Sequence, residues 1–161
     1  MMFNLRVSHL FRSSCLIIGS LCLLGCDSET SETSEMTSAT CSQPDVGCFD
    51  QSWELMSDNY MLTMQVATPS LPERGENTWV IAIEDMLTDE SAVDCTLLVT
   101  PFMPEHNHGA PMAPIVTELS DGEYEINQIV FSMPGLWEMR FEVSCGSEET
   151  DNLVYAFWLD A

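Results

Sequence analysis

Apolar and polar residues alternate without a break from Trp137 to Cys145, and this pattern constrains the fold more than any other feature of the chain. Side chains of a strand point alternately to its two faces, so the segment predicts a strand with one buried and one solvated face. Long helical periodicity is absent from the sequence. We therefore expect an all-β domain. The residues predicted to face inward are Trp137, Met139, Phe141, Val143 and Cys145.

Six further segments have strand character, and turn-forming residues such as Asp121-Gly122 and Pro134-Gly135 separate them. Seven short strands with frequent turns are typical of an immunoglobulin-like sandwich of two sheets. We expect Trp158 to face the opposite way from Phe157. The six segments are Met61–Ala67, Thr78–Glu84, Val93–Thr100, Ile115–Leu119, Tyr124–Phe131 and Leu153–Leu159. The aromatic residues expected in the core are Trp79, Tyr124, Trp137, Phe141, Tyr155 and Phe157.

Four cysteines follow residue 40, namely Cys41, Cys48, Cys95 and Cys145. An even number in an exported chain predicts two disulfides, for which three pairings are open. Cys95 lies on the apolar side of the alternation in Val93–Thr100, so Cys95 and Cys145 are both expected to face inward and to join two strands. Cys41 and Cys48 would then close a small loop. A zinc site is the alternative, but these spacings differ from those of zinc knuckles.

Residues 1–25 have the features of a processing segment. Arg6 and Arg12 precede an apolar run, Cys15–Leu24, that is too short to span a bilayer. The run ends in Leu-Leu-Gly-Cys26, which resembles the lipobox of bacterial lipoproteins, although Leu24 is bulkier than usual. The resemblance implies that Cys26 is acylated and becomes the first residue, which anchors the protein to a membrane of the cell envelope. An ordinary signal peptide or an uncleaved anchor is the alternative.

Residues 26–40 read as a tether between this anchor and a domain at 41–161. Ser, Thr and Glu dominate the tether, and Met36 and Ala39 are the only apolar residues between Asp27 and Thr40. Such a segment cannot bury enough apolar surface to offset its ordering entropy, so we expect disorder. Asp27 resembles the inner-membrane retention signal of enteric bacteria, and the choice between inner and outer membrane stays open.

The exported chain is strongly acidic. All 26 acidic residues lie after residue 25, where the basic side chains are Arg74 and Arg140 and lysine is absent. Two arginines against 26 acidic residues give a formal charge of −24 for residues 26–161. Such a charge repels nucleic acid and anionic lipid surfaces, which excludes both as expected partners.

Both histidines of the exported chain, His106 and His108, lie two residues apart, with Met103 and Met112 nearby in sequence. Imidazole and thioether groups are ligands that suit copper, and thioether sulfur favours Cu(I). In an extended segment the two imidazoles would project to the same side. The alternative is that the histidines hold a turn and that the methionines fill the core.

Two motifs resemble the signatures of a known family. Met103-Pro-Glu-His-Asn-His-Gly109 is similar to the Met-Pro-x-x-x-His-Gly signature of FixH/YtkA-like domains, and Gly122-x-Tyr124 followed by Phe131–Glu138 resembles their second signature. The resemblance covers about Leu62 to Trp158. It implies a small extracytoplasmic β-sandwich, often membrane-anchored, with copper handling associated with FixH-type members. Met103, His106 and His108 match the region of the proposed ligands, and Met112 is added because it lies near them.

These observations favour a membrane-anchored binding module that takes copper through His106, His108, Met103 and Met112, with a copper-handling protein as its partner. A structural or protein-interaction sandwich of the cell envelope is the alternative. We expect no enzymatic activity, because the chain has no Gly-x-Ser-x-Gly or His-Glu-x-x-His motif and its mature cysteines are expected to be oxidised.

Overall fold

The computed structural model describes residues 41–161, except 44, 46 and 147–149. The predicted signal segment 1–25, the lipidation site Cys26 and the tether 26–40 therefore lie outside the described residues. The described residues belong to one compact unit. This unit contains the whole apolar core described below, so it has what a domain needs to fold alone.

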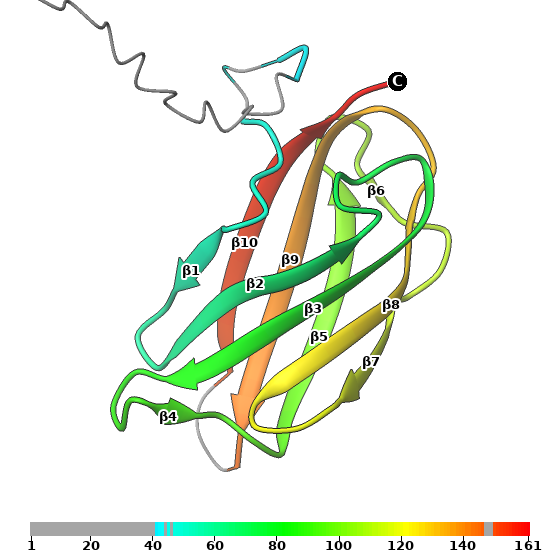
Figure 1. Cartoon of the computed structure of the whole chain (residues 1–161). Coiled ribbons are helices and arrows are strands. Elements are labelled where there is room, and N and C mark those ends of the chain that lie inside the picture. The colour runs from blue at the N-terminus through cyan, green and yellow to red at the C-terminus, as the bar shows by residue number, and fades with distance from the viewer. Residues whose placement is uncertain (1–40, 44, 46, 147–149) are drawn as a thin grey trace, which may run out of the picture. The chain divides into compact units, whose positions relative to one another are not determined.

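The described residues form ten strands in two antiparallel sheets, which confirms the predicted all-β sandwich (Figure 1). The larger sheet has the order β1-β2-β3-β8-β7, with β4 paired to β3, and the smaller has the order β10-β9-β5-β6. The strands are β1 Glu54–Met56, β2 Tyr60–Thr68, β3 Gly75–Asp85, β4 Glu90–Ser91, β5 Cys95–Met103, β6 His108–Gly109, β7 Ile115–Glu118, β8 Glu123–Phe131, β9 Gly135–Cys145 and β10 Asp151–Leu159. Among these residues, no helix has the length and apolar character needed to cross a membrane.

All seven predicted strands are present, and the alternation of β9 is confirmed along its length. Sequence reasoning missed β1, β4 and β6, because strands of two or three residues are too short to show a period. It was wrong about Val93, which is 50% exposed and precedes β5. The intervening Asp94 has a positive φ of 55°, which breaks the alternation between Val93 and Cys95.

The core lies between the sheets and is rich in aromatic rings. All six predicted aromatic core residues are buried, and two more, Phe49 and Trp53, join them from the segment before β1. The ring of Phe49 lies 5.4 Å from Trp79, and Trp53 stacks on Tyr155 at 4.9 Å. Phe49 and Trp53 lie outside any alternating segment, so only their contacts identify them as core.

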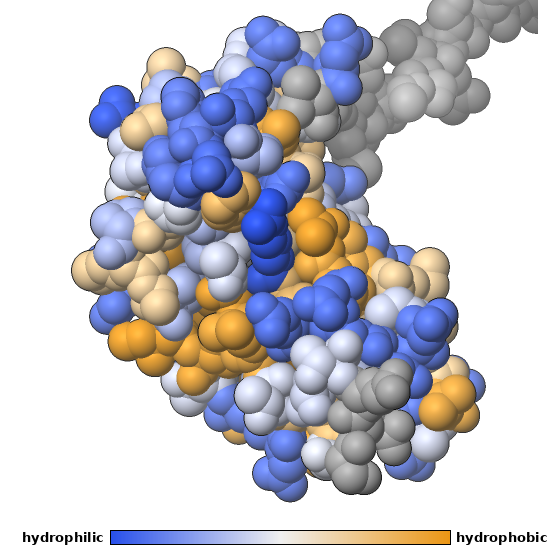
Figure 2. Space-filling view, turned by 180° about the vertical axis from the view of Figure 1, so that it is seen from behind, coloured by the Kyte–Doolittle hydropathy of each residue, from blue (hydrophilic) through white to orange (hydrophobic). Residues whose placement is uncertain are grey.

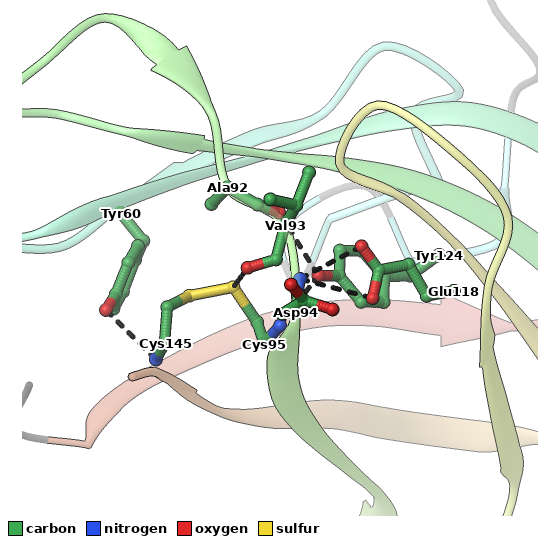
Figure 3. The surroundings of a disulfide bond; sticks show 8 residues. All are labelled: Tyr60, Ala92, Val93, Asp94, Cys95, Glu118, Tyr124 and Cys145. Carbon is green, nitrogen blue, oxygen red and sulfur yellow. Dashed lines mark hydrogen bonds between the residues drawn. A yellow bond between two sulfur atoms is a disulfide. The ribbon is translucent and has the colours of Figure 1, made fainter. Parts of the chain in front are cut away.

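Both predicted disulfides are present, Cys41–Cys48 and Cys95–Cys145. Cys95 and Cys145 are directly opposite one another in the β5–β9 pair. Two tyrosine hydroxyls from the other sheet accept hydrogen bonds from the backbone beside this disulfide: Tyr60 Oη from Cys145 N at 3.2 Å and Tyr124 Oη from Cys95 N at 3.1 Å (Figure 3). The two sheets are thus tied together at this end by polar as well as apolar contacts.

Replacing Cys95 and Cys145 together by serine should lower the free energy of unfolding by about 4 kcal/mol, because the disulfide closes a loop with a sequence separation of 50. The matched change at Cys41 and Cys48, with a separation of 7, should cost only about 2.5 kcal/mol. Urea denaturation of both double variants checks the ranking. A larger loss at Cys41 and Cys48 would contradict the loop-length argument.

Burial raises the pKa of Tyr155 to about 12, against the effect of a 2.7 Å hydrogen bond from Asp50 N to Tyr155 Oη. A tyrosine of the unfolded chain ionises near its ordinary pKa of 10.0, so this group stabilises the fold fully below pH 10 and less as the pH rises toward 12. Tyr155→Phe should therefore lose less stability than the wild type between pH 10 and 12. Urea unfolding across this range measures the difference, and equal losses in both proteins would contradict the assignment.

Candidate functional site

The two histidines lie on a tight hairpin between β5 and β6. Met103 pairs with His108, and the backbone N–H of His106 donates to the carbonyl oxygen of Met103 at 3.3 Å. Pro104 follows Met103 at the position where its fixed φ favours a turn, and Asn107 has the positive φ of 53° that Asn tolerates. The Met-Pro-x-x-Asn-His segment therefore folds locally into a turn that carries His106 at its tip.

The structure brings the two imidazoles side by side. Their ring centroids are 5.8 Å apart, and the ring planes differ by 34°. His106 is exposed and His108 is half-buried. Nδ1 of His108 lies 2.9 Å from the carbonyl oxygen of Gly109, which can only accept a hydrogen bond, so Nδ1 donates. In the neutral imidazole the lone pair is then on Nε2, which is the nitrogen of His108 available to a metal.

Met103 does not belong to this exposed pair, because its side chain is fully buried in the core. A Cβ placed on Gly135 would lie 2.9 Å from the terminal methyl of Met103. Its burial could have been inferred from the sequence: Cys95, Leu97, Val99 and Met103 all lie on one face of β5, and that face points inward. We therefore leave Met103 out of the proposed ligand set.

Met112 is 48% exposed, and no hydrogen bond or ring contact joins it to either histidine among the described residues. It lines a small hollow of about 190 Å³ beside β5, together with Leu98, Pro101 and Gly109, and neither histidine lines it. Within the part of the chain that the structure describes, no group of three or more His, Cys, Asp or Glu side chains is placed to hold a metal. The protein thus offers two imidazoles as ligands.

The second signature segment lies against the first. Gly135 begins β9 with a φ of 132°, which favours glycine, and its open side faces Met103. Oε2 of Glu105, in the histidine turn, is 3.9 Å from the same position. Trp137 Nε1 donates to the carbonyl oxygen of Met133 at 3.0 Å and closes the turn before β9. The histidine turn and the Phe131–Glu138 part of the second signature therefore pack together at one end of the sandwich, whereas Tyr124 lies beside the Cys95–Cys145 disulfide.

The sequence profile described as YtkA-like matches residues 57–142, which is more than half of the chain and includes both signature segments. The chain belongs to the YtkA-like family. This confirms the resemblance seen in the two motifs. The matched segment reaches from just before β2 to the later part of β9, so most of the sandwich of this YtkA-like protein lies inside it.

Three solved structures are similar to the YtkA-like chain. One is a DUF4426 family protein from Pseudomonas aeruginosa, with 5% identity, coverage of 66% of this chain and 96% of that chain, and a TM-score of 0.48. Another is FetP of uropathogenic Escherichia coli, with 10% identity, coverage of 68% and 94%, and a TM-score of 0.49. A copper-bound variant of FetP has 10% identity, coverage of 68% and 95%, and a TM-score of 0.48. No curated protein matches the sequence.

Gly135→Ala should destabilise the domain by about 1–3 kcal/mol, because it adds a methyl group against buried Met103 at a strained φ. Gly75→Ala is the matched control, since Gly75 has a φ of 108° and nothing within 4 Å of an added Cβ. Urea denaturation of both variants separates packing from backbone strain. Equal losses would show that the methyl of Met103 moves aside freely.

Proposed function

We propose that this YtkA-like protein is a non-catalytic, lipid-anchored module outside the cytoplasm that binds a copper ion through His106 and His108. Two disulfides support an oxidising compartment. The lipobox-like sequence before Cys26 supports anchoring to a membrane of the cell envelope. The proposal for the metal depends on the geometry of the histidine pair.

The distance between the imidazoles is the observation that carries the proposal. A metal about 2.0–2.1 Å from one nitrogen of each ring places the two ring centroids about 5–6 Å apart. The centroids here are 5.8 Å apart, and the hairpin that holds them is closed by backbone hydrogen bonds. The spacing of the two rings is therefore compatible with one ion bound by both.

The composition of the ligand set favours copper as Cu(II). Copper stands highest among the divalent ions in affinity for imidazole ligands, and thioether ligands are what would shift the preference toward Cu(I). Met103 is fully buried, and Met112 lines a hollow that neither histidine lines, so the proposal uses the two imidazoles as the protein ligands. Two protein ligands leave the other coordination positions to water or to a partner protein, which suits a carrier that exchanges its ion.

A titration of residues 36–161 with Cu(II) against a competing chelator tests this proposal. We expect one ion per chain and an affinity at least tenfold lower in the variant His106→Ala/His108→Ala, because each imidazole contributes to the binding free energy of the ion. Met112→Leu is the matched control and should leave the affinity unchanged. Electron paramagnetic resonance should show nitrogen coupling in the wild type that disappears in the double variant.

Weak binding that is equal in the wild type and the double histidine variant would contradict the copper site and would reflect the acidic surface alone. It would favour the second candidate, an interaction module of the cell envelope. That candidate is supported by the outer face of the smaller sheet, where Leu98 of β5 is 50% exposed and Val154 of β10 is 49% exposed. Figure 2 shows this side of the molecule, where patches of apolar residues lie between hydrophilic ones.

A further inference from the structure

A hollow of about 420 Å³ lies apart from the histidine pair, where three segments distant in sequence meet. They are the loop closed by Cys41–Cys48, the β2–β3 connection, and the end of β10 with the residues that follow it. This volume is within the range of about 300–1,000 Å³ typical of small-ligand sites. Sequence patterns did not reveal the hollow, because none of the three segments carries a recognisable motif.

The lining of the hollow is largely apolar. Phe157 is fully buried and Phe49 is 9% exposed, and their rings meet edge to face at 5.4 Å. Trp158 and the rim residue Leu71, which is 45% exposed, add further apolar surface. An apolar ligand body that entered here would therefore exchange water for aromatic and aliphatic contacts.

Arg74 adds a positive charge to this lining. Within the described residues the one ion pair is Arg140 with Glu138 at 2.7 Å, so the guanidinium of Arg74 has no carboxylate within 4.0 Å. Arg74 also lines a neighbouring shallow hollow with Gly75 and Ser132. In a chain with 26 acidic residues, an arginine left without an acidic partner beside an apolar hollow is a ready acceptor for an anionic group.

A buried asparagine holds the segment that carries Arg74. Asn77 is 1% exposed, and its side-chain oxygen accepts from the backbone N–H of Glu73 at 3.1 Å. Its side-chain nitrogen donates to the carbonyl oxygens of Glu73 at 2.9 Å and Gly75 at 3.1 Å. These bonds bracket Arg74 on both sides, so its backbone is fixed before any ligand arrives.

Hydrogen bonds also fix the opposite wall of the hollow, which consists of the Cys41–Cys48 loop and the end of β10. The backbone N–H of Trp158 donates to the carbonyl oxygen of Gly47 at 2.9 Å, which ties the disulfide loop to β10. The carboxylate of Asp160 accepts hydrogen bonds from the backbone N–H of Ser42 at 3.2 Å and from the Ser42 hydroxyl. Asp160 is thus engaged by Ser42, whereas Arg74 and its exposed neighbour Glu73 also line the hollow, and Arg74 has no ion-pair partner among the described residues.

We propose that this hollow binds a small amphiphilic carboxylate, with its apolar body against Phe49 and Trp158 and its carboxylate on Arg74. The guanidinium offers parallel N–H donors that match a carboxylate, and the same positive charge disfavours an ammonium ligand. No histidine lines the hollow, so this site is independent of the copper site. We therefore expect the carboxylate to bind in the hollow whether or not copper occupies the histidine pair.

Three probes with the same apolar chain and different head groups test the proposal: octanoate, 1-octanol and octylammonium. Calorimetric titration of residues 36–161 should show octanoate binding about tenfold more tightly than 1-octanol, and octylammonium binding more weakly than either. Methyl resonances of Leu71 and Leu159 should shift in the NMR spectrum on addition of octanoate. Tighter binding of octylammonium than of octanoate, or the absence of octanoate binding, would overturn the proposal.

The two arginines of the domain supply a matched pair of variants. Arg74→Gln should lower the affinity for octanoate about tenfold and leave that for 1-octanol unchanged, because only the charge-assisted contact is lost. Arg140→Gln removes the same charge outside the hollow and should change neither affinity. Equal effects of the two substitutions would show that net charge, not the hollow, controls binding, and would also overturn the proposal.

Discussion

The register of β9 is the constraint on which the rest of the structure depends. β9 pairs with β10 on one side and with β5 on the other. Its apolar residues fill one side of the core, so a shift of one residue would turn them all toward solvent. The disulfide between Cys95 and Cys145 secures one end of this register, and the contact of Gly135 with Met103 marks the other.

Both proposed sites lie at the end of the sandwich where β9 begins. Gly135 pairs with Leu159, which lines the hollow, and its open side faces Met103, which pairs with His108. The order β10-β9-β5-β6 places the hollow and the histidine pair three strands apart, or about 14 Å at ~4.8 Å per strand. The fold thus holds two separate groups of side chains at one end of the sandwich, near opposite edges of the smaller sheet.

Charge is distributed in this domain so that its two arginines have different environments. Arg140 lies over the ring of Phe102 at 3.8 Å and forms an ion pair with Glu138. Its positive charge is therefore already paired on the outer face of the smaller sheet. Arg74 is exposed beside the hollow and has no such partners among the described residues. The acidic surface attracts cations in general, but an anion finds a favourable local field only near a guanidinium that is not already paired.

Local pattern was sufficient to predict the seven strands of four or more residues, because the alternation of residues such as Trp137, Met139 and Phe141 depends only on strand geometry. It was also sufficient for the Cys95–Cys145 pairing and for the nearness of His106 to His108. Tertiary structure alone decided that Asn77 is buried and holds the Arg74 segment, and that Phe49 and Trp158 border a hollow. Those outcomes depend on contacts between segments far apart in the chain, and no period or spacing within one segment encodes them.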